Sequence, residues 1–144
     1  GEVPFDEPYA KRTAQGLILG PDGEKMSKSK GNVVDPNDVV DVYGADVLRV
    51  YVLFMGDYEQ AAPWSENSMK GCKRFLDRIW ALQDKLVDGD EYRPELRAAM
   101  HRTIKKVSKD IEDMKFNTAV AAMMTLIPRL AAFLANSSTA SGVR

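Results

Sequence analysis

The sequence predicts a mainly α-helical protein in which a short β hairpin with a loop precedes a partial antiparallel helical bundle. In the C-terminal half, apolar residues recur at intervals of three and four, the spacing of one helix face. Near the N-terminus, the apolar run Leu17–Leu19 is followed directly by a Gly-Pro-Asp-Gly turn. The 44% hydrophobic and 28% charged residues are typical of a folded globular chain and not of a disordered one.

The first 63 residues are predicted to form an irregular lead-in and a small mixed module. Residues 1–15 are polar and carry two prolines, so no regular structure is expected there. Residues 16–63 begin with the apolar run and its turn, in which proline presets one backbone angle and glycine accepts positive φ. A small hairpin that returns through Lys25 and Met26 is therefore expected.

Two short helices are predicted inside this module. Asp35 can cap free backbone amides and Pro36 suits the first helical position, so one helix begins here and ends at Gly44. A second helix is predicted from Ala45 to about Met55. Its valines leave a strand as the alternative.

The helical bundle is predicted over residues 64–135. Ser65 opens a long helix that continues to residues 88–90 and has one broad apolar face. Cys72 lies on that face and is therefore expected to be a buried thiol. Trp64 and Trp80 are expected to be core or seam residues.

Two further helices and a tail complete the predicted bundle. Pro94 suits the start of the next helix, and Asn117 can cap the last one. Pro128 is expected to kink or stop that helix because it lacks a backbone amide proton. Residues 136–144 are small and polar and are expected to form a disordered tail.

Charge and composition narrow the classes of function. The formal net charge is -1, so binding to nucleic acid would require a local basic patch. Cys72 is the single cysteine, which excludes an internal disulfide. No apolar run approaches the roughly 20 residues that span a bilayer, and no secretory signal opens the chain, so no membrane partner is expected. The first residue is not Met, which suggests a segment excised from a longer protein.

The densest chemical signal is the stretch from Lys25 to Asn32. Three lysines, two serines and a glycine are crowded into it. Lysine amines act as compact positive charges, and hydroxyls and backbone amides form stronger hydrogen bonds when their partner is ionised. Such a loop suits a polyphosphate, and a solvated basic loop is the competing interpretation.

Residues Lys25–Ser29 spell KMSKS and resemble the signature of the class I aminoacyl-tRNA synthetases. The similarity continues from Asp22 to Arg49, a run that the leucyl, methionyl, valyl and isoleucyl branches share. The flanks, above all residues 3–8 and 71–80, resemble the leucyl branch. The similarity covers residues 3–127 and implies a C-terminal segment of such an enzyme. In that family, residues 16–63 would be a stem-contact-like module and residues 64–135 an anticodon-binding-like bundle.

The resemblance implies an ATP-dependent leucine–tRNA ligase in the cytoplasm. Such an enzyme adenylates leucine with ATP and Mg²⁺, releases pyrophosphate and transfers leucine to tRNA(Leu). Lys28 would be the catalytic cation that stabilises charge on the pyrophosphate. Lys25 would assist with the triphosphate, and Ser27 and Ser29 would add hydrogen bonds. Met26 would pack near the adenine or pin the loop.

The resemblance also implies limits on this segment alone. The HIGH-type motif of the class is absent from the sequence, so the segment is expected to be inactive by itself and to hold no tightly bound cofactor. Its exposed apolar face is expected to allow self-association. Two alternatives remain: a methionyl-tRNA synthetase segment, and a helical module that only binds RNA.

Weaker signals concern RNA and metal binding. Two sets of basic residues at helical spacing predict tRNA-binding stripes, with a solvated helix face as the alternative. The first set is Lys70, Lys73, Arg74 and Arg78, and the second is Arg102, Lys105, Lys106 and Lys109. His101 has no second ligand nearby in sequence, so no metal site is expected.

Overall fold

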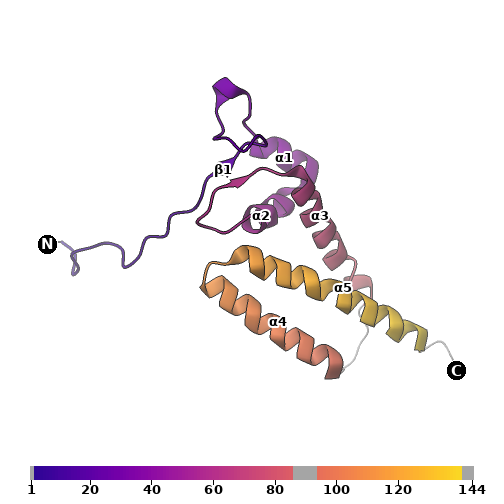
Figure 1. Ribbon diagram of the computed structural model, residues 1–144. Helices are drawn as coiled ribbons and strands as arrows, with labels where there is room; N and C mark the ends of the chain where they lie inside the picture. Colours follow the sequence, from indigo (N-terminus) through magenta and orange to yellow (C-terminus); the bar gives the residue numbers. More distant parts are fainter. Residues whose placement is uncertain (1, 86–93, 141–144) are drawn as a thin grey trace.

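The computed structural model describes residues 2–85 and 94–140, which form a mainly helical fold (Figure 1). In order, the elements are β1 (Ile18–Leu19), η1 (Lys28–Lys30), α1 (Pro36–Tyr43), α2 (Ala45–Phe54), β2 (Ala62–Pro63), α3 (Glu66–Trp80), η2 (Gln83–Lys85), α4 (Pro94–Glu112) and α5 (Phe116–Ala140). The N-terminal residues run as an extended arm toward β1, and the α4–α5 pair lies beneath α2 and α3 (Figure 1).

The strand β1 pairs mainly with β2 and not with the segment that follows it. The pairing is parallel, with Ile18 opposite Ala62 and Leu19 opposite Pro63. The predicted hairpin is reduced to one antiparallel bridge between Leu19 and Lys25. The amides of Ala62 and Trp64 donate to the carbonyls of Leu17 and Leu19 at 3.1 and 3.0 Å. Pro63, which has no amide proton, lies between them, where this ladder needs no donor.

The first two helices begin and end as the sequence predicts. The Asp35 carboxylate accepts a hydrogen bond from the Asn37 amide at 2.8 Å, and Pro36 is the first residue of α1. Gly44 separates α1 from α2 with φ at 88°, a conformation that favours glycine. The segment from Ala45 is a helix and not the alternative strand.

The core lies where α1, α2 and α3 meet. Its buried cluster consists of Val39, Val47, Tyr51, Met69 and Cys72. Tyr51 and Cys72 are fully buried, which confirms the prediction for the thiol. The rings of Tyr51 and Trp64 meet edge to face, with centroids 4.9 Å apart. Trp64 is thus a seam residue, whereas Trp80 is 74% exposed and the prediction for it was wrong.

The helix α3 is shorter than predicted. Ser65 caps it by accepting the Ser68 amide, as expected, but the helix ends at Trp80 and not near residues 88–90. A tighter 3₁₀ turn, η2, follows it, stabilised by the Leu82 and Lys85 amides. Residues 86–93 lie outside the described residues.

The helix α5 corrects two predictions, for its start and for the tail, and it excludes one of the two alternatives for Pro128. It begins at Phe116, so Asn117 lies in its first turn instead of capping it, and its Oδ1 accepts the Thr118 amide at 2.9 Å. Pro128 lies inside the helix and does not stop it, because one missing amide proton removes only one ladder bond. The helix continues to Ala140, so the predicted tail is helical there, and residues 141–144 lie outside the described residues.

The helix α5 is also more apolar than the sequence analysis allowed. Residues 116–134 have a mean hydropathy of 1.4 and are long and apolar enough, by length and composition only, to cross a membrane. The expectation that no apolar run approaches this length was therefore wrong. In the fold, α5 packs against α4, α2 and α3, and Met124 contacts the core cluster.

Candidate nucleotide loop and basic surfaces

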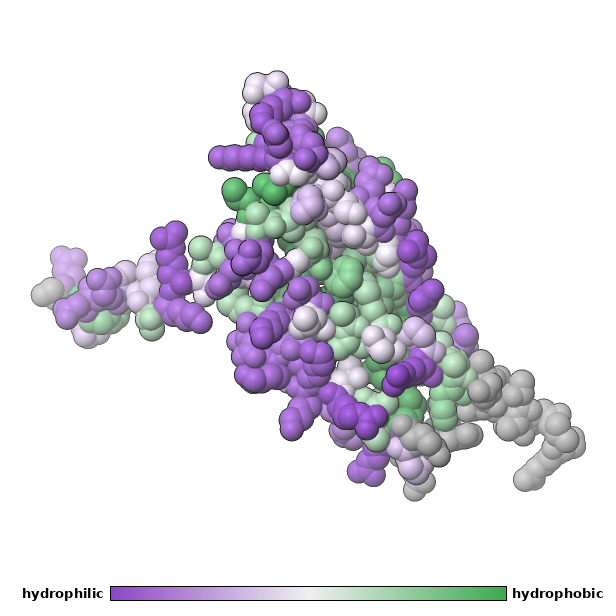
Figure 2. Space-filling view, in the orientation of Figure 1, coloured by the Kyte–Doolittle hydropathy of each residue, from purple (hydrophilic) through white to green (hydrophobic). Residues whose placement is uncertain are grey.

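The lysine-rich loop projects from the rest of the molecule (Figure 1), and Figure 2 shows hydrophilic residues over its outer part. The Gly20–Gly23 turn opens it, with the Gly23 amide donating to the Gly20 carbonyl at 2.9 Å. The short η1 helix forms its tip. Gly31 ends that helix with φ at 65°, and its amide donates to the Lys28 carbonyl at 3.3 Å.

A polar network joins the two ends of the loop. The Asn32 side chain donates to the Asp22 carboxylate at 3.0 Å, and its Oδ1 accepts the Ser27 amide at 2.8 Å. Asp22 also accepts the Glu24 amide at 3.0 Å. The Glu24 amide first, and the Asn32 side chain second, hold the pKa of Asp22 below its usual value.

The structure separates the three loop lysines into two kinds. Lys30 forms a salt bridge with Glu24 across the loop. Among the described residues, the exposed amines of Lys25 and Lys28 take part in no salt bridge. The hydroxyls of Ser27 and Ser29 are 2.8 Å apart. Two amines and a pair of hydroxyls are thus available to a phosphate, while Lys30 has its charge balanced.

The four residues of the predicted basic stripe on α3 are all exposed, and they differ in their neighbours. Lys73 forms a salt bridge with Asp77 at 2.8 Å. Arg74 and Arg78 line a cavity of about 200 Å³ toward Pro128 of α5. Lys70 is exposed and is not among the lining residues. Arg74 and Arg78 thus share one cavity, whereas the Lys73 charge is balanced by Asp77.

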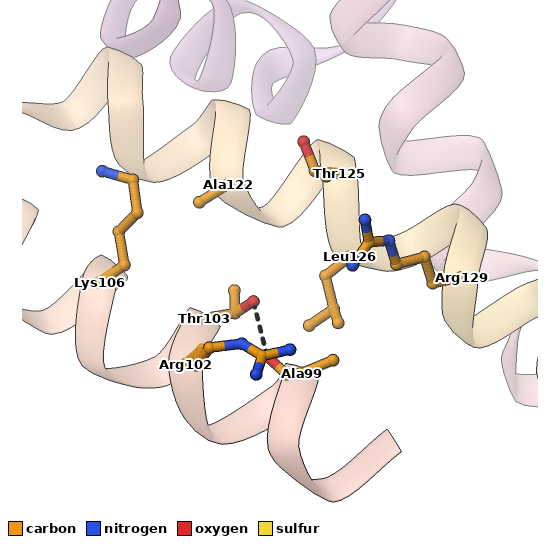
Figure 3. A pocket seen from close by; sticks show the side chains of 8 residues that line it. All are labelled: Ala99, Arg102, Thr103, Lys106, Ala122, Thr125, Leu126 and Arg129. Carbon is orange, nitrogen blue, oxygen red and sulfur yellow. Dashed lines mark hydrogen bonds between the residues drawn. The ribbon is translucent and has the colours of Figure 1, made fainter. Parts of the chain in front are cut away.

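Two residues of the second predicted basic face, Arg102 and Lys106, lie in a groove between α4 and α5 (Figure 3). The groove has a volume of about 290 Å³ and is lined by Arg102 and Lys106 from α4 and by Arg129 from α5. Lys106 forms a salt bridge with Asp110 at 2.7 Å. Within residues 2–85 and 94–140, neither arginine of the groove forms a salt bridge.

The sequence analysis missed Arg129. Its signal in the sequence was available, because Arg129 is the single charged residue in the mostly apolar stretch from Phe116 to Leu134. The other two residues of the predicted face lie elsewhere. Lys105 is exposed outside the groove, and Lys109 forms a salt bridge with Asp113 at 2.7 Å.

One carboxylate joins α4 to α5. Asp110 is 7% exposed and accepts hydrogen bonds from Lys106 and from the Thr118 hydroxyl, both at 2.7 Å. These two bonds, the Lys106 bond being the stronger influence, lower the pKa of Asp110. The searched part of the chain, residues 2–85 and 94–140, contains no group of three or more potential metal ligands.

Comparison with known proteins supports the class that the loop indicates. The family model described as tRNA synthetases class I (I, L, M and V) matches residues 2–65, which include the whole loop, α1 and α2. The loop and the helices that follow it therefore place the chain among homologues of the class I aminoacyl-tRNA synthetases.

Within that class, the chain is a homologue of the leucine–tRNA ligases. It is 60% identical over 127 residues to the leucine–tRNA ligase of Alkaliphilus oremlandii, covering 88% of this chain and 16% of that protein. It is 50% identical over 135 residues to that of Bdellovibrio bacteriovorus, covering 90% of this chain and 17% of that protein. The chain thus spans about a sixth of the length of these relatives.

A solved structure of the same family matches this chain over almost its whole length. The crystal structure of the Agrobacterium radiobacter K84 agnB2 LeuRS-tRNA-LeuAMS ternary complex superposes with a TM-score of 0.82 at 31% identity. The match covers 95% of this chain and 19% of that chain. These relatives do not favour the methionyl alternative.

Proposed function

We propose that this chain is the segment of a leucine–tRNA ligase that supplies the ATP loop and part of the tRNA-contacting helices. The observation that carries the proposal is the loop itself. Among the described residues, the exposed amines of Lys25 and Lys28 form no salt bridge, and the hydroxyls of Ser27 and Ser29 lie side by side. These groups belong to the segment that is 60% identical to a leucine–tRNA ligase. The division into residues 16–63, as the loop module, and 64–135, as the helical part, belongs to the same proposal.

The chemistry assigned to the loop is stabilisation of the leaving group. When the leucine carboxylate attacks the α-phosphate of ATP, the bond to pyrophosphate breaks and negative charge grows on the pyrophosphate. A cation that binds this charge more tightly in the transition state than in the ground state accelerates the step. Lys28 has this role, Lys25 holds the triphosphate, and Ser27 and Ser29 donate hydrogen bonds. Met26, which is half-buried, pins the loop.

Two parts of the reaction come from outside the described residues. ATP is the substrate, and Mg²⁺ accompanies its phosphates. The described residues contain no group of three or more potential metal ligands. Mg²⁺ usually binds to proteins through a few carboxylates together with substrate phosphates.

The helical part is proposed to contact tRNA through phosphates. Arg74 and Arg78 toward α5, and Arg102 with Arg129 in the α4–α5 groove, are the arginine pairs available for this. From Pro94 to Ala140, seven basic residues stand against four acidic ones, in a chain whose net charge is -1. The α4–α5 pair therefore carries a net positive charge, which favours phosphate binding.

The test of the proposed function is pyrophosphate exchange by the full-length protein that contains this segment. Leucine-dependent exchange of labelled pyrophosphate into ATP, absent with methionine, is the expected result. Aminoacylation of tRNA(Leu) should follow in the same preparation. Binding of tRNA without exchange in the presence of any amino acid would favour the helical module that only binds RNA.

A further inference from the structure

The side chain of Asn32 uses both ends of its amide at the base of the loop. Its nitrogen donates to both carboxylate oxygens of Asp22, at 3.0 and 3.2 Å, and approaches the Lys25 carbonyl at 3.4 Å. Its oxygen accepts the Ser27 amide at 2.8 Å. Asn32 is half-buried, whereas most of the loop is exposed. One side chain, from beyond the end of the signature, therefore contacts Asp22 in the turn before it and Lys25 and Ser27 within it.

We propose that Asn32, held by Asp22, is a positioning residue that clasps the two ends of the lysine loop and thereby sets the position of Lys28. The inference rests on the proposed function of the loop in adenylate formation. Asn32 touches none of the reacting groups in this assignment and acts through the loop backbone alone.

The hydrogen bonds allow one orientation of the amide. Turning it over would set the oxygen against the Asp22 carboxylate and the Lys25 carbonyl, and the nitrogen against the Ser27 amide. Both contacts would then join two acceptors or two donors. Asn32 is therefore locked by partners on three sides. A carboxylate partner also makes the bond to Asp22 stronger than one between neutral groups.

The Asp22 and Asn32 side chains lie close against the backbone of Gly20. A Cβ atom at Gly20 would lie 2.6 Å from Asp22 Oδ1 and 2.9 Å from Asn32 Nδ2. Gly20 is buried, and its amide donates to the Glu24 carbonyl at 2.8 Å. The clasp is thus packed directly against the turn.

The loop has few other means of holding its shape. Met26 is its one half-buried apolar side chain, and the Lys30–Glu24 salt bridge joins two exposed residues, which contributes little. Removing the clasp should therefore move Lys28 relative to ATP. A displacement of about 1 Å of a catalytic group can lower a rate roughly 100-fold.

The decisive variants change the charge of the clasp. Asn32→Asp places a second carboxylate beside that of Asp22. The two negative charges repel, and the N–H donor of the Asn32 amide is lost. The double variant Asp22→Asn with Asn32→Asp restores one donor and one acceptor in the reversed order, and the new carboxylate at position 32 can still accept the Ser27 amide. Asn67→Ala is the matched control, because Asn67 is an exposed asparagine of α3.

In the full-length enzyme, Asn32→Asp is expected to lower kcat for leucine-dependent exchange about 100-fold and to leave KM for leucine unchanged. The double variant should recover most of the loss, and Asn67→Ala should match wild type. Full activity of Asn32→Asp, or no recovery in the double variant, would overturn the inference. An inactive wild type would instead refute the proposed function, and the inference with it.

A second measurement needs no activity. In the 144-residue chain, hydrogen exchange of the Ser27 amide should become roughly fivefold faster in Asn32→Ala, the change expected for loss of one ordinary hydrogen bond. The same amide in Asn67→Ala should exchange at the wild-type rate. Equal rates in wild type and Asn32→Ala would show that the clasp does not hold the loop.

Discussion

The phenolic oxygen of Tyr51 accepts a hydrogen bond from the backbone amide of Ser65 at 2.7 Å. Tyr51 is fully buried in α2, and Ser65 is the residue that caps α3. The bond therefore ties the start of α3 to the middle of α2, across the loop that contains β2. Through the pairing of β2 with β1, it also fixes the strand from which the lysine loop departs.

Tyr51→Phe should lower the free energy of unfolding by about 1 kcal/mol, because it leaves the Ser65 amide without this acceptor in a partly buried position. Urea unfolding followed by circular dichroism would measure the change as a lower midpoint with an unchanged slope. Tyr9→Phe is the control, since Tyr9 is 79% exposed. Equal loss in the two variants would mean that the hydroxyl at position 51 has no specific role.

Lys28→Ala in the full-length enzyme should lower the rate of adenylate formation about 10²–10³-fold, as expected for loss of a contact made mainly in the transition state. Lys30→Ala should have a much smaller effect, because the Lys30 charge is already balanced by Glu24. Single-turnover adenylate formation would separate chemistry from leucine binding. Equal losses in the two variants would contradict the division of the lysines into paired and unpaired.

Arg129→Ala should weaken tRNA binding and lower the slope of log affinity against log salt by about 1, the change expected for one lost phosphate contact. Arg102→Ala should behave in the same way, since both guanidinium groups line one groove. Lys73→Ala is the matched control because Lys73 is paired with Asp77. Filter binding of tRNA at several salt concentrations is the measurement, and an unchanged slope in both arginine variants would exclude the groove.

The Asp110 carboxylate should make the α4–α5 pair sensitive to acid. Its pKa is lowered in the fold, so its stabilising contribution is present above the usual value of 3.8 and is lost as pH falls through the lower folded value. Asp110→Asn should therefore lower the Tm at neutral pH, and the difference from wild type should shrink in acid. A difference in Tm that stays constant from neutral pH to strong acid would rule out this explanation.

The Cys72 thiol should be protected until the chain unfolds. It is fully buried, and burial raises its pKa above the usual 9.0. Its contribution to stability is therefore present below that value and is lost as pH rises through the higher folded value. Iodoacetamide at mildly alkaline pH should modify Cys72 slowly in the native chain and rapidly in urea. Rapid modification of the native chain would place the thiol outside the core.

Much of the local structure could be predicted from the sequence because its determinants act over a few residues. Asp35 with Pro36, Ser65 and Pro94 begin helices where expected, since capping and the missing proline amide are local effects. The predictions for the end of α3, the start of α5 and the tail from residue 136 were wrong, and Pro128 does not stop α5. Helix ends depend on packing against α2 and α4, which outweighs one lost hydrogen bond.

For the candidate site too, some features follow from the sequence and others only from the tertiary structure. By itself, the sequence determined the chemistry of the loop, because three lysines and two serines are adjacent in the chain. Only the tertiary structure decided that β1 pairs with β2, that Lys30 is balanced by Glu24 and that Arg129 joins Arg102 in one groove. Each of these depends on residues that meet in space after the chain has folded. A one-dimensional pattern specifies which charges a segment carries, whereas through-space contacts decide which of them remain free to bind a ligand.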